Sequence, residues 1–178
     1  WKVRFDGYDF EEQKKLNFNA EYYDESMMRN HYGYYLLDQV GVDISYCDYC
    51  NLWMNDEYFG VYIMLEQVDK HYLRDRGYDD SDKIYKNNYS KFHVSDDYSR
   101  EWEIENGTDD YETLDQLIRS VYYTPDTKIK RTLDSLFYME KVLRYYAILA
   151  LINDYDFTTH NFYLHQEAST GKWNIIPW

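Results

Sequence analysis

The stretch NDYDFTTHN, residues 153–161, lies between an apolar segment and two short runs with strand character. The apolar segment predicts a helix over residues 134–153, and its part from 143 to 152 is apolar nearly all round, which is typical of a buried spine. The two runs, 161–165 and 173–176, flank small turn residues and predict a hairpin. The polar stretch therefore lies in a turn between a buried helix and a strand, where side chains can converge on a cleft.

Two side chains of this stretch have the spacing of a phosphoryl-transfer loop. Asp156 and Asn161 are five positions apart, as in the pattern D-x-x-x-x-N. In such loops the aspartate orients the acceptor hydroxyl, and the asparagine oxygen helps to hold magnesium against the nucleotide phosphates. The spacing alone leaves a structural alternative open, in which Asp154 or Asp156 turns the chain at the helix end and His160 is a hydrogen-bonded structural residue.

The first 75 residues predict a mixture of strands and helices. Residues 1–5 resemble a strand, and Asp24 can cap a helix that Gly41 ends. Two aromatic and β-branched runs, 44–54 and 58–65, flank turn residues and predict an antiparallel hairpin. A short helix is expected over residues 68–75. The first helix should be amphipathic, and its apolar face is expected to consist of Met28, Tyr35, Leu36 and Val40.

Residues 76–110 are polar and predict long loops with one strand at 83–86. A helix over 111–123 should then break at Pro125. The whole pattern predicts a single α+β domain over 1–178, with a sheet-rich front lobe over 1–70 and a mainly helical back lobe over 71–178. Such a layout hosts many functions and by itself specifies none.

Composition excludes several classes of protein. The formal net charge of −14 would repel a nucleic-acid backbone, so basic proteins or metal cations are the expected partners. The longest aliphatic run is far below the roughly 18 residues that a membrane span needs. The 23 tyrosines can cover apolar surface while their hydroxyls stay in water, and sugar stacking or cross-linking is the alternative.

Cysteine and histidine spacing argues against a metal site. Cys47 and Cys50 form a single C-x-x-C, for which a local disulfide or two idle thiols are favoured over zinc. His31, His71, His93 and His165 share no ligand spacing.

Seven short motifs, in order along nearly the whole chain, resemble those of the spore coat CotH kinase family. They are Lys15-Leu16-Asn17-Phe18-Asn19, Ser26-Met27-Met28-Arg29, Gly60-Val61-Tyr62, Glu66-Gln67-Val68-Asp69-Lys70, Tyr85-Lys86, His160-Asn161 and Gly171-Lys172-Trp173 through Ile176-Pro177-Trp178. The resemblance implies an atypical protein-kinase-like, two-lobed fold. It also implies transfer of phosphate from ATP, with Mg²⁺ or Mn²⁺, to serines or threonines of basic, Ser-rich secreted or coat proteins.

The resemblance also implies roles for particular residues. Asp156 is similar to the catalytic-loop aspartate, and Asn161 to its metal-side partner. Glu66, Gln67 and Val68 would form the hinge under the adenine, and Trp173 would line the nucleotide pocket. Arg29 and Lys86 match basic positions that contact phosphates or form ion pairs, whereas Arg4 and Lys15 are expected to be structural.

The family pattern continues with an aspartate after Pro-Trp, and this sequence stops one residue before it. We therefore expect a fragment truncated at both ends, which by itself would bind Mg-ATP poorly. The expected location is extracellular, at a spore surface or in a secreted assembly. The alternatives are a non-catalytic surface adhesin or assembly module and a carbohydrate-active enzyme.

Overall fold

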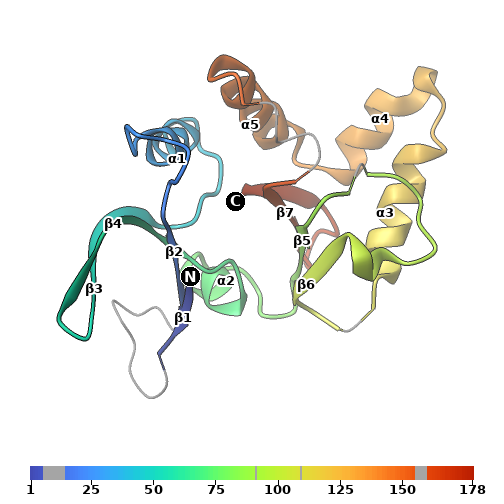
Figure 1. Cartoon of the computed structure of the whole chain (residues 1–178). Coiled ribbons are helices and arrows are strands. Elements are labelled where there is room, and N and C mark those ends of the chain that lie inside the picture. Colours follow the sequence, from blue (N-terminus) through green and yellow to red (C-terminus); the bar gives the residue numbers. More distant parts are fainter. Residues whose placement is uncertain (6–14, 91, 109, 155–159) are drawn as a thin grey trace.

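The computed structural model describes residues 1–5, 15–90, 92–108, 110–154 and 160–178. Two four-stranded antiparallel sheets and five α-helices make up this part of the chain (Figure 1). The predicted α+β class is confirmed. Within the described residues, no helix is both long enough and apolar enough to cross a bilayer.

The N-terminal sheet is built from the first 66 residues. It has the strand order β1-β2-β4-β3, with β1 at Lys2–Arg4, β2 at Lys15–Asn19, β3 at Cys47–Met54 and β4 at Glu57–Glu66. The predicted hairpin is confirmed, because Asn55 and Asp56 have φ values of 51° and 64°, which suit a tight turn between right-twisted strands. The hairpin projects from the molecule in Figure 1.

Helix α1 spans Arg29–Gln39 and ends as expected at Gly41, which has a φ of 74°. Asp24 accepts a hydrogen bond from the Arg29 N–H at 2.8 Å, so it caps the helix from five residues upstream. The expected apolar face was partly wrong, because the side chains of Met28 and Tyr35 are 59% and 51% exposed.

The buried face of α1 consists of Gly33, Tyr34 and Leu37. Tyr34 packs against Ile63 and Leu65 of β4. A sequence with tyrosine at positions 32, 34 and 35 fits several helical phases, because a tyrosine can be placed in the core or at the surface.

The C-terminal sheet has the order β6-β5-β7-β8. Its strands are β5 (Lys83–Asn87), β6 (Trp102–Asn106), β7 (Phe162–Gln166) and β8 (Trp173–Pro177). The late hairpin β7–β8 is confirmed, but the polar region contains a second strand, β6, that was not expected. Helix α2 (Lys70–Asp75) packs on one face of this sheet, where Tyr72 and Leu73 contact Ile84, Tyr163 and Ile176.

The opposite face of the C-terminal sheet is covered by α3 (Glu112–Tyr122), α4 (Asp126–Leu136) and α5 (Met139–Leu151). The prediction of one helix from 134 was wrong, since α4 ends and α5 begins on either side of Phe137 and Tyr138. Phe137 is extended and buried, and the Tyr138 N–H donates to the Trp173 carbonyl at 3.0 Å. Anchoring of this dipeptide to β8 interrupts the helix without glycine or proline.

Helix α5 is buried on one face only. Val142, Tyr145, Ile148 and Leu149 are buried, whereas the side chains of Leu143 and Leu151 are 61% and 74% exposed. The expectation of a spine buried all round was therefore wrong. Helix α1 approaches the end of α5 closely at Gly33. A Cβ atom added to this glycine would lie 3.7 Å from Cδ1 of Ile152, which follows α5.

One carboxylate ties distant parts of the chain together. Asp43 Oδ2, in the loop after α1, accepts hydrogen bonds from Tyr78 Oη at 2.9 Å, Lys141 Nζ at 2.8 Å and Asn174 Nδ2 at 2.5 Å. This oxygen thus joins the loop to α5 and β8. The two sheets lie on either side of residue 70 in the sequence, and the expected one-domain, two-lobe organisation stays a prediction.

Candidate functional site

Lys86 lies in the middle of the α2-covered face of the C-terminal sheet. Strand register places it opposite Tyr163 of β7 and Glu103 of β6. Its Nζ lies 4.2 Å from the ring centroid of Trp178 and 5.8 Å from that of Tyr163. These distances are typical of cation–π contacts, so the ammonium is held against the end of β8.

Charged neighbours set the electrostatics around Lys86. Burial lowers the pKa of the Lys86 ammonium, and the carboxylates of Glu105 and Glu103 oppose this shift. Burial raises the pKa of Glu105, while the cations of Lys2 and Lys86 lower it. Lys2 belongs to β1, and its charge acts on the pKa values of both Lys86 and Glu105. We call Lys2, Lys86, Glu103, Glu105, Tyr163 and Trp178 the Lys86 cluster.

Asn161 is adjacent to this cluster through the backbone. The Trp178 N–H donates to the Asn161 carbonyl at 3.0 Å, and Asn161 has a left-handed φ of 66°. The ring centroid of the neighbouring His160 lies 4.7 Å from that of Tyr89. Asp156, the expected catalytic aspartate, lies outside the described residues.

The expected hinge segment follows β4 directly. Glu66, Gln67 and Val68 are all buried. Arg76 and the Tyr46 N–H bind the Glu66 carboxylate, and Asn17 Nδ2 donates to Gln67 Oε1 at 3.0 Å. Val68 packs in the core beneath α2. These side chains hold the protein's own structure together, and a hinge role for the segment stays a prediction.

The structure places the remaining predicted residues in two different environments. The side chain of Trp173 is 2% exposed and packs in the core against Tyr85, with ring centroids 6.0 Å apart. The side chain of Arg29 is 81% exposed, and its Nε lies 3.7 Å from Asp24 Oδ1. In the structure, Trp173 therefore packs in the core, and Arg29 forms an ion pair at the surface. Their assigned nucleotide and phosphate roles stay predictions.

Sequence reasoning missed Lys2, Glu103 and Glu105 as members of the site. The signal for the two glutamates is the alternation Glu103-Ile104-Glu105 after the buried Trp102, which is the period-two pattern of a strand. Nothing in the sequence indicates that the charge of Lys2 acts on Glu105.

A buried Asp–His pair lies elsewhere on the same face. His165 and Asp82 are 0% and 2% exposed, and His165 Nε2 lies 2.9 Å from Asp82 Oδ2. The other oxygen of Asp82 accepts from the Ala168 N–H at 2.8 Å, and the Tyr78 ring packs edge-on against the imidazole. The pair joins the start of β5 to the β7–β8 turn, which is a structural role.

Among the described residues, no group of three His, Cys, Asp or Glu side chains is arranged to hold a metal ion. Cys47 and Cys50 are free thiols. Three positions apart on β3, they point to opposite faces, which excludes a local disulfide. Burial raises the pKa of Cys47 to about 12, so it is almost entirely protonated at neutral pH.

The fold and the site define an α+β protein with two antiparallel sheets, in which a half-buried lysine of the C-terminal sheet is held against an aromatic ring. The chain belongs to the CotH kinase protein family, whose model matches residues 1–178. It is 28% identical, over 179 residues, to the inner spore coat protein H of Bacillus subtilis (strain 168). That alignment covers 95% of this chain and 49% of the relative, so the chain spans about half of the relative's length.

Proposed function

We propose that this protein transfers phosphate from ATP to serine or threonine hydroxyls of basic, Ser-rich coat or secreted proteins. The observation that carries the proposal is the half-buried Lys86, held against Trp178 beside the backbone of Asn161. A partly desolvated ammonium held against an aromatic ring suits nucleotide phosphates. Family membership and the similarity to a spore coat protein support the reaction and a spore-surface location.

Each group has a role in this proposal. Asp156 orients the acceptor hydroxyl, and Lys86 binds the phosphates. When bound, ATP would supply the phosphoryl group, and Mg²⁺ or Mn²⁺ would neutralise the charge of its phosphates. Asn161 would be a metal ligand, and Glu66–Val68 would line the adenine from the end of β4. A lysine ammonium beside a tryptophan ring fits a nucleotide, whose phosphates are anionic and whose base can stack on an aromatic ring.

The charge of the chain favours a basic substrate. At −14, long-range attraction raises the encounter rate with Lys- and Arg-rich segments, and the effect weakens as salt screens it.

The test is transfer of radiolabelled phosphate from ATP to a Lys/Arg-rich serine peptide. It uses the 178-residue chain and a form that continues past Trp178, each with Asp156→Asn and Lys86→Met. Lys130→Met on the exposed face of α4 is the matched control. We expect both site variants to lose at least 100-fold in kcat/KM, because both groups act on the reacting atoms. Full activity of Asp156→Asn would overturn the assignment.

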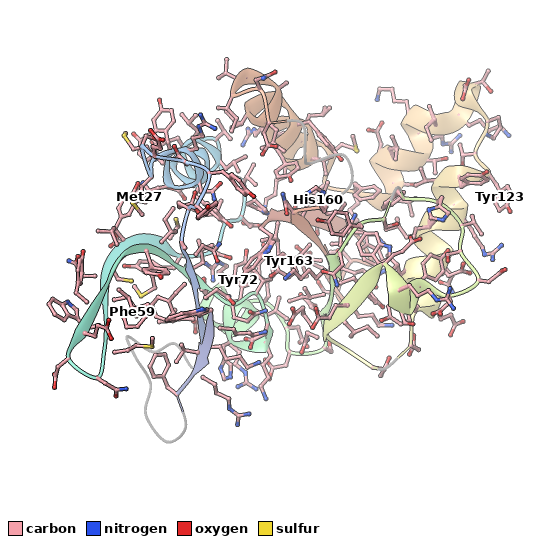
Figure 2. The ribbon with its side chains drawn as sticks, in the orientation of Figure 1. Met27, Phe59, Tyr72, Tyr123, His160 and Tyr163 are labelled. Atoms are coloured by element: carbon pink, nitrogen blue, oxygen red, sulfur yellow. The ribbon has the colours of Figure 1, made fainter. Side chains whose placement is uncertain are left out.

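A second function, a non-catalytic assembly module, is favoured by the aromatic surface of the β3–β4 hairpin. Trp53, Tyr58 and Phe59 are 61%, 48% and 40% exposed, and Figure 2 shows Phe59 on this projecting hairpin. Exposed aromatic side chains are enriched in protein interfaces. Binding of coat proteins that survives chelation and Asp156→Asn but is lost in Trp53→Ser/Phe59→Ser would favour this function over the kinase.

A further inference from the structure

A pocket of about 350 Å³ is lined by Arg4, Lys15, Lys70, His71 and Arg74. These residues come from β1, β2 and α2, which Figure 1 shows close to one another. All five are basic residue types, whereas the chain as a whole has a net charge of −14. Among the described residues, no carboxylate lines the pocket. The sign of the local charge is therefore opposite to that of the molecule.

Two pairs of positively charged residues occupy neighbouring positions on their strands or helix. Arg4 lies directly opposite Lys15 in the β1–β2 register. Lys70 and Arg74 are four residues apart on α2, and so lie on the same side of the helix. Like charges directly opposite on strands or at i,i+4 on a helix are destabilising. An anion between these side chains would reduce the repulsion further than the carboxylates that already pair with Lys15 and Arg74.

Neighbouring carboxylates neutralise part of the charge from outside the lining. Lys15 Nζ pairs with the buried Asp69 at 2.9 Å, and Arg74 pairs with Asp80 through its Nε at 2.7 Å. The hydrogen bond from Arg74 lowers the pKa of Asp80, and the charge of Lys70 adds to this shift. The two carboxylates also hold Lys15 and Arg74 in place, so the pocket is organised before a ligand arrives.

We infer that this pocket binds a phosphate group carried by a phosphoserine side chain or by a nucleotide. Phosphate is the anion that lysine and arginine together recognise best, since it offers several strong acceptor oxygens at one point. The volume is within the range of ligand pockets and exceeds what a halide ion would need. None of the lining residues belongs to the Lys86 cluster, although the charge of Lys15 acts on Glu105 of that cluster.

The first experiment measures binding of inorganic phosphate by calorimetry, at ionic strength matched with chloride. We expect wild-type protein to bind, and Lys70→Gln to bind roughly tenfold more weakly, because one charge-assisted hydrogen bond is lost. Lys70 is exposed, so the variant keeps the core intact. Lys130→Gln on α4 is the matched control and should bind like wild type. Phosphate should also raise the Tm of the wild type more than that of Lys70→Gln.

Further arms identify the carrier of the phosphate. A phosphoserine peptide is compared with its unphosphorylated form and with metal-free ATP, in wild type, Lys70→Gln and Lys86→Gln. Tighter binding of the phosphopeptide that depends on Lys70 supports a protein ligand, and tighter binding of ATP that depends on Lys70 supports a nucleotide. Loss of binding in Lys86→Gln but not in Lys70→Gln, or no phosphate binding by folded wild type, overturns the inference. None of these measurements requires phosphate transfer, so failure of the proposed kinase activity is a separate outcome.

Discussion

Arg76 donates two hydrogen bonds to the carboxylate of Glu66, from Nη2 to Oε2 at 2.8 Å and from Nη1 to Oε1 at 3.1 Å. The Glu66 side chain is 1% exposed, and the guanidinium also stacks on Tyr72, 3.7 Å from its centroid. Arg76 follows α2, whereas Glu66 ends β4. This pair therefore fixes α2 against the last residue of the N-terminal sheet.

Replacement of Arg76 should leave Glu66 buried without its partner. We expect Arg76→Met to lower the free energy of unfolding by about 3 kcal/mol, as for other broken buried pairs. Urea denaturation followed by tryptophan fluorescence measures the change. Arg100→Met is the control, since Arg100 pairs with Asp97 on the surface with 82% of its side chain exposed, and should change stability by less than about 1 kcal/mol. Equal effects of the two variants would contradict a stabilising role for the Arg76–Glu66 pair.

Replacement of Lys86 should have the opposite effect on stability to replacement of Arg76, because the half-buried Lys86 ammonium destabilises the fold. Burial lowers the pKa of its ammonium below 10.5, so the folded chain binds this proton less tightly than the unfolded chain. At neutral pH, Lys86→Met should therefore be at least as stable as the wild type, although it loses activity. As pH rises through the window between the lowered pKa and 10.5, wild type should gain stability relative to the variant. Urea titrations across this window would show a widening gap in favour of the variant if this account is wrong.

The buried Asp82 should matter far more than its exposed neighbour. Asp82→Ala removes the acceptor of both His165 Nε2 and the Ala168 N–H, and we expect a loss of about 3 kcal/mol. Asp79→Ala is the matched control, because Asp79 is exposed and only holds the Ser81 turn. Thermal denaturation of both variants decides the matter, and a Tm for Asp82→Ala as high as that of the control would rule out a stabilising pair.

The two thiols should react slowly with iodoacetamide in the folded protein. The thiolate is the nucleophile, and burial raises the pKa of Cys47 to about 12 and that of Cys50 above its ordinary value. Cys50 should react before Cys47, and both should react quickly once the chain is unfolded in urea. A disulfide, or rapid alkylation of both cysteines in the native protein, detected by mass spectrometry, would contradict this prediction.

Local chemistry was sufficient to predict the elements that strong turn or cap signals define. Asn55-Asp56 predicted the β3–β4 hairpin, and Asp24 with Gly41 predicted the ends of α1. Helix α4 was missed because none of its residues is buried and only a few of them are apolar. Its boundary with α5 is set by the contact of Tyr138 with Trp173, which no local pattern encodes.

The candidate site was predictable to a smaller extent. Lys86 and Asn161 could be singled out from motifs, and the structure brings both to Trp178. Lys2 could not be found, since it belongs to the other sheet and its effect on Lys86 and Glu105 arises only on folding. The basic pocket likewise joins three elements distant in sequence, so its charge emerges only on folding.

The triple contact of Asp43 has a consequence for how this chain is synthesised. Its partner Asn174 is 131 residues further along. Translation proceeds at about 5–20 residues per second, so Asn174 is synthesised on the order of ten seconds after Asp43. During that time β5 also lacks β7, and its apolar residues stay uncovered. The N-terminal sheet can therefore form early, whereas the C-terminal sheet should close only after β8 has left the ribosome.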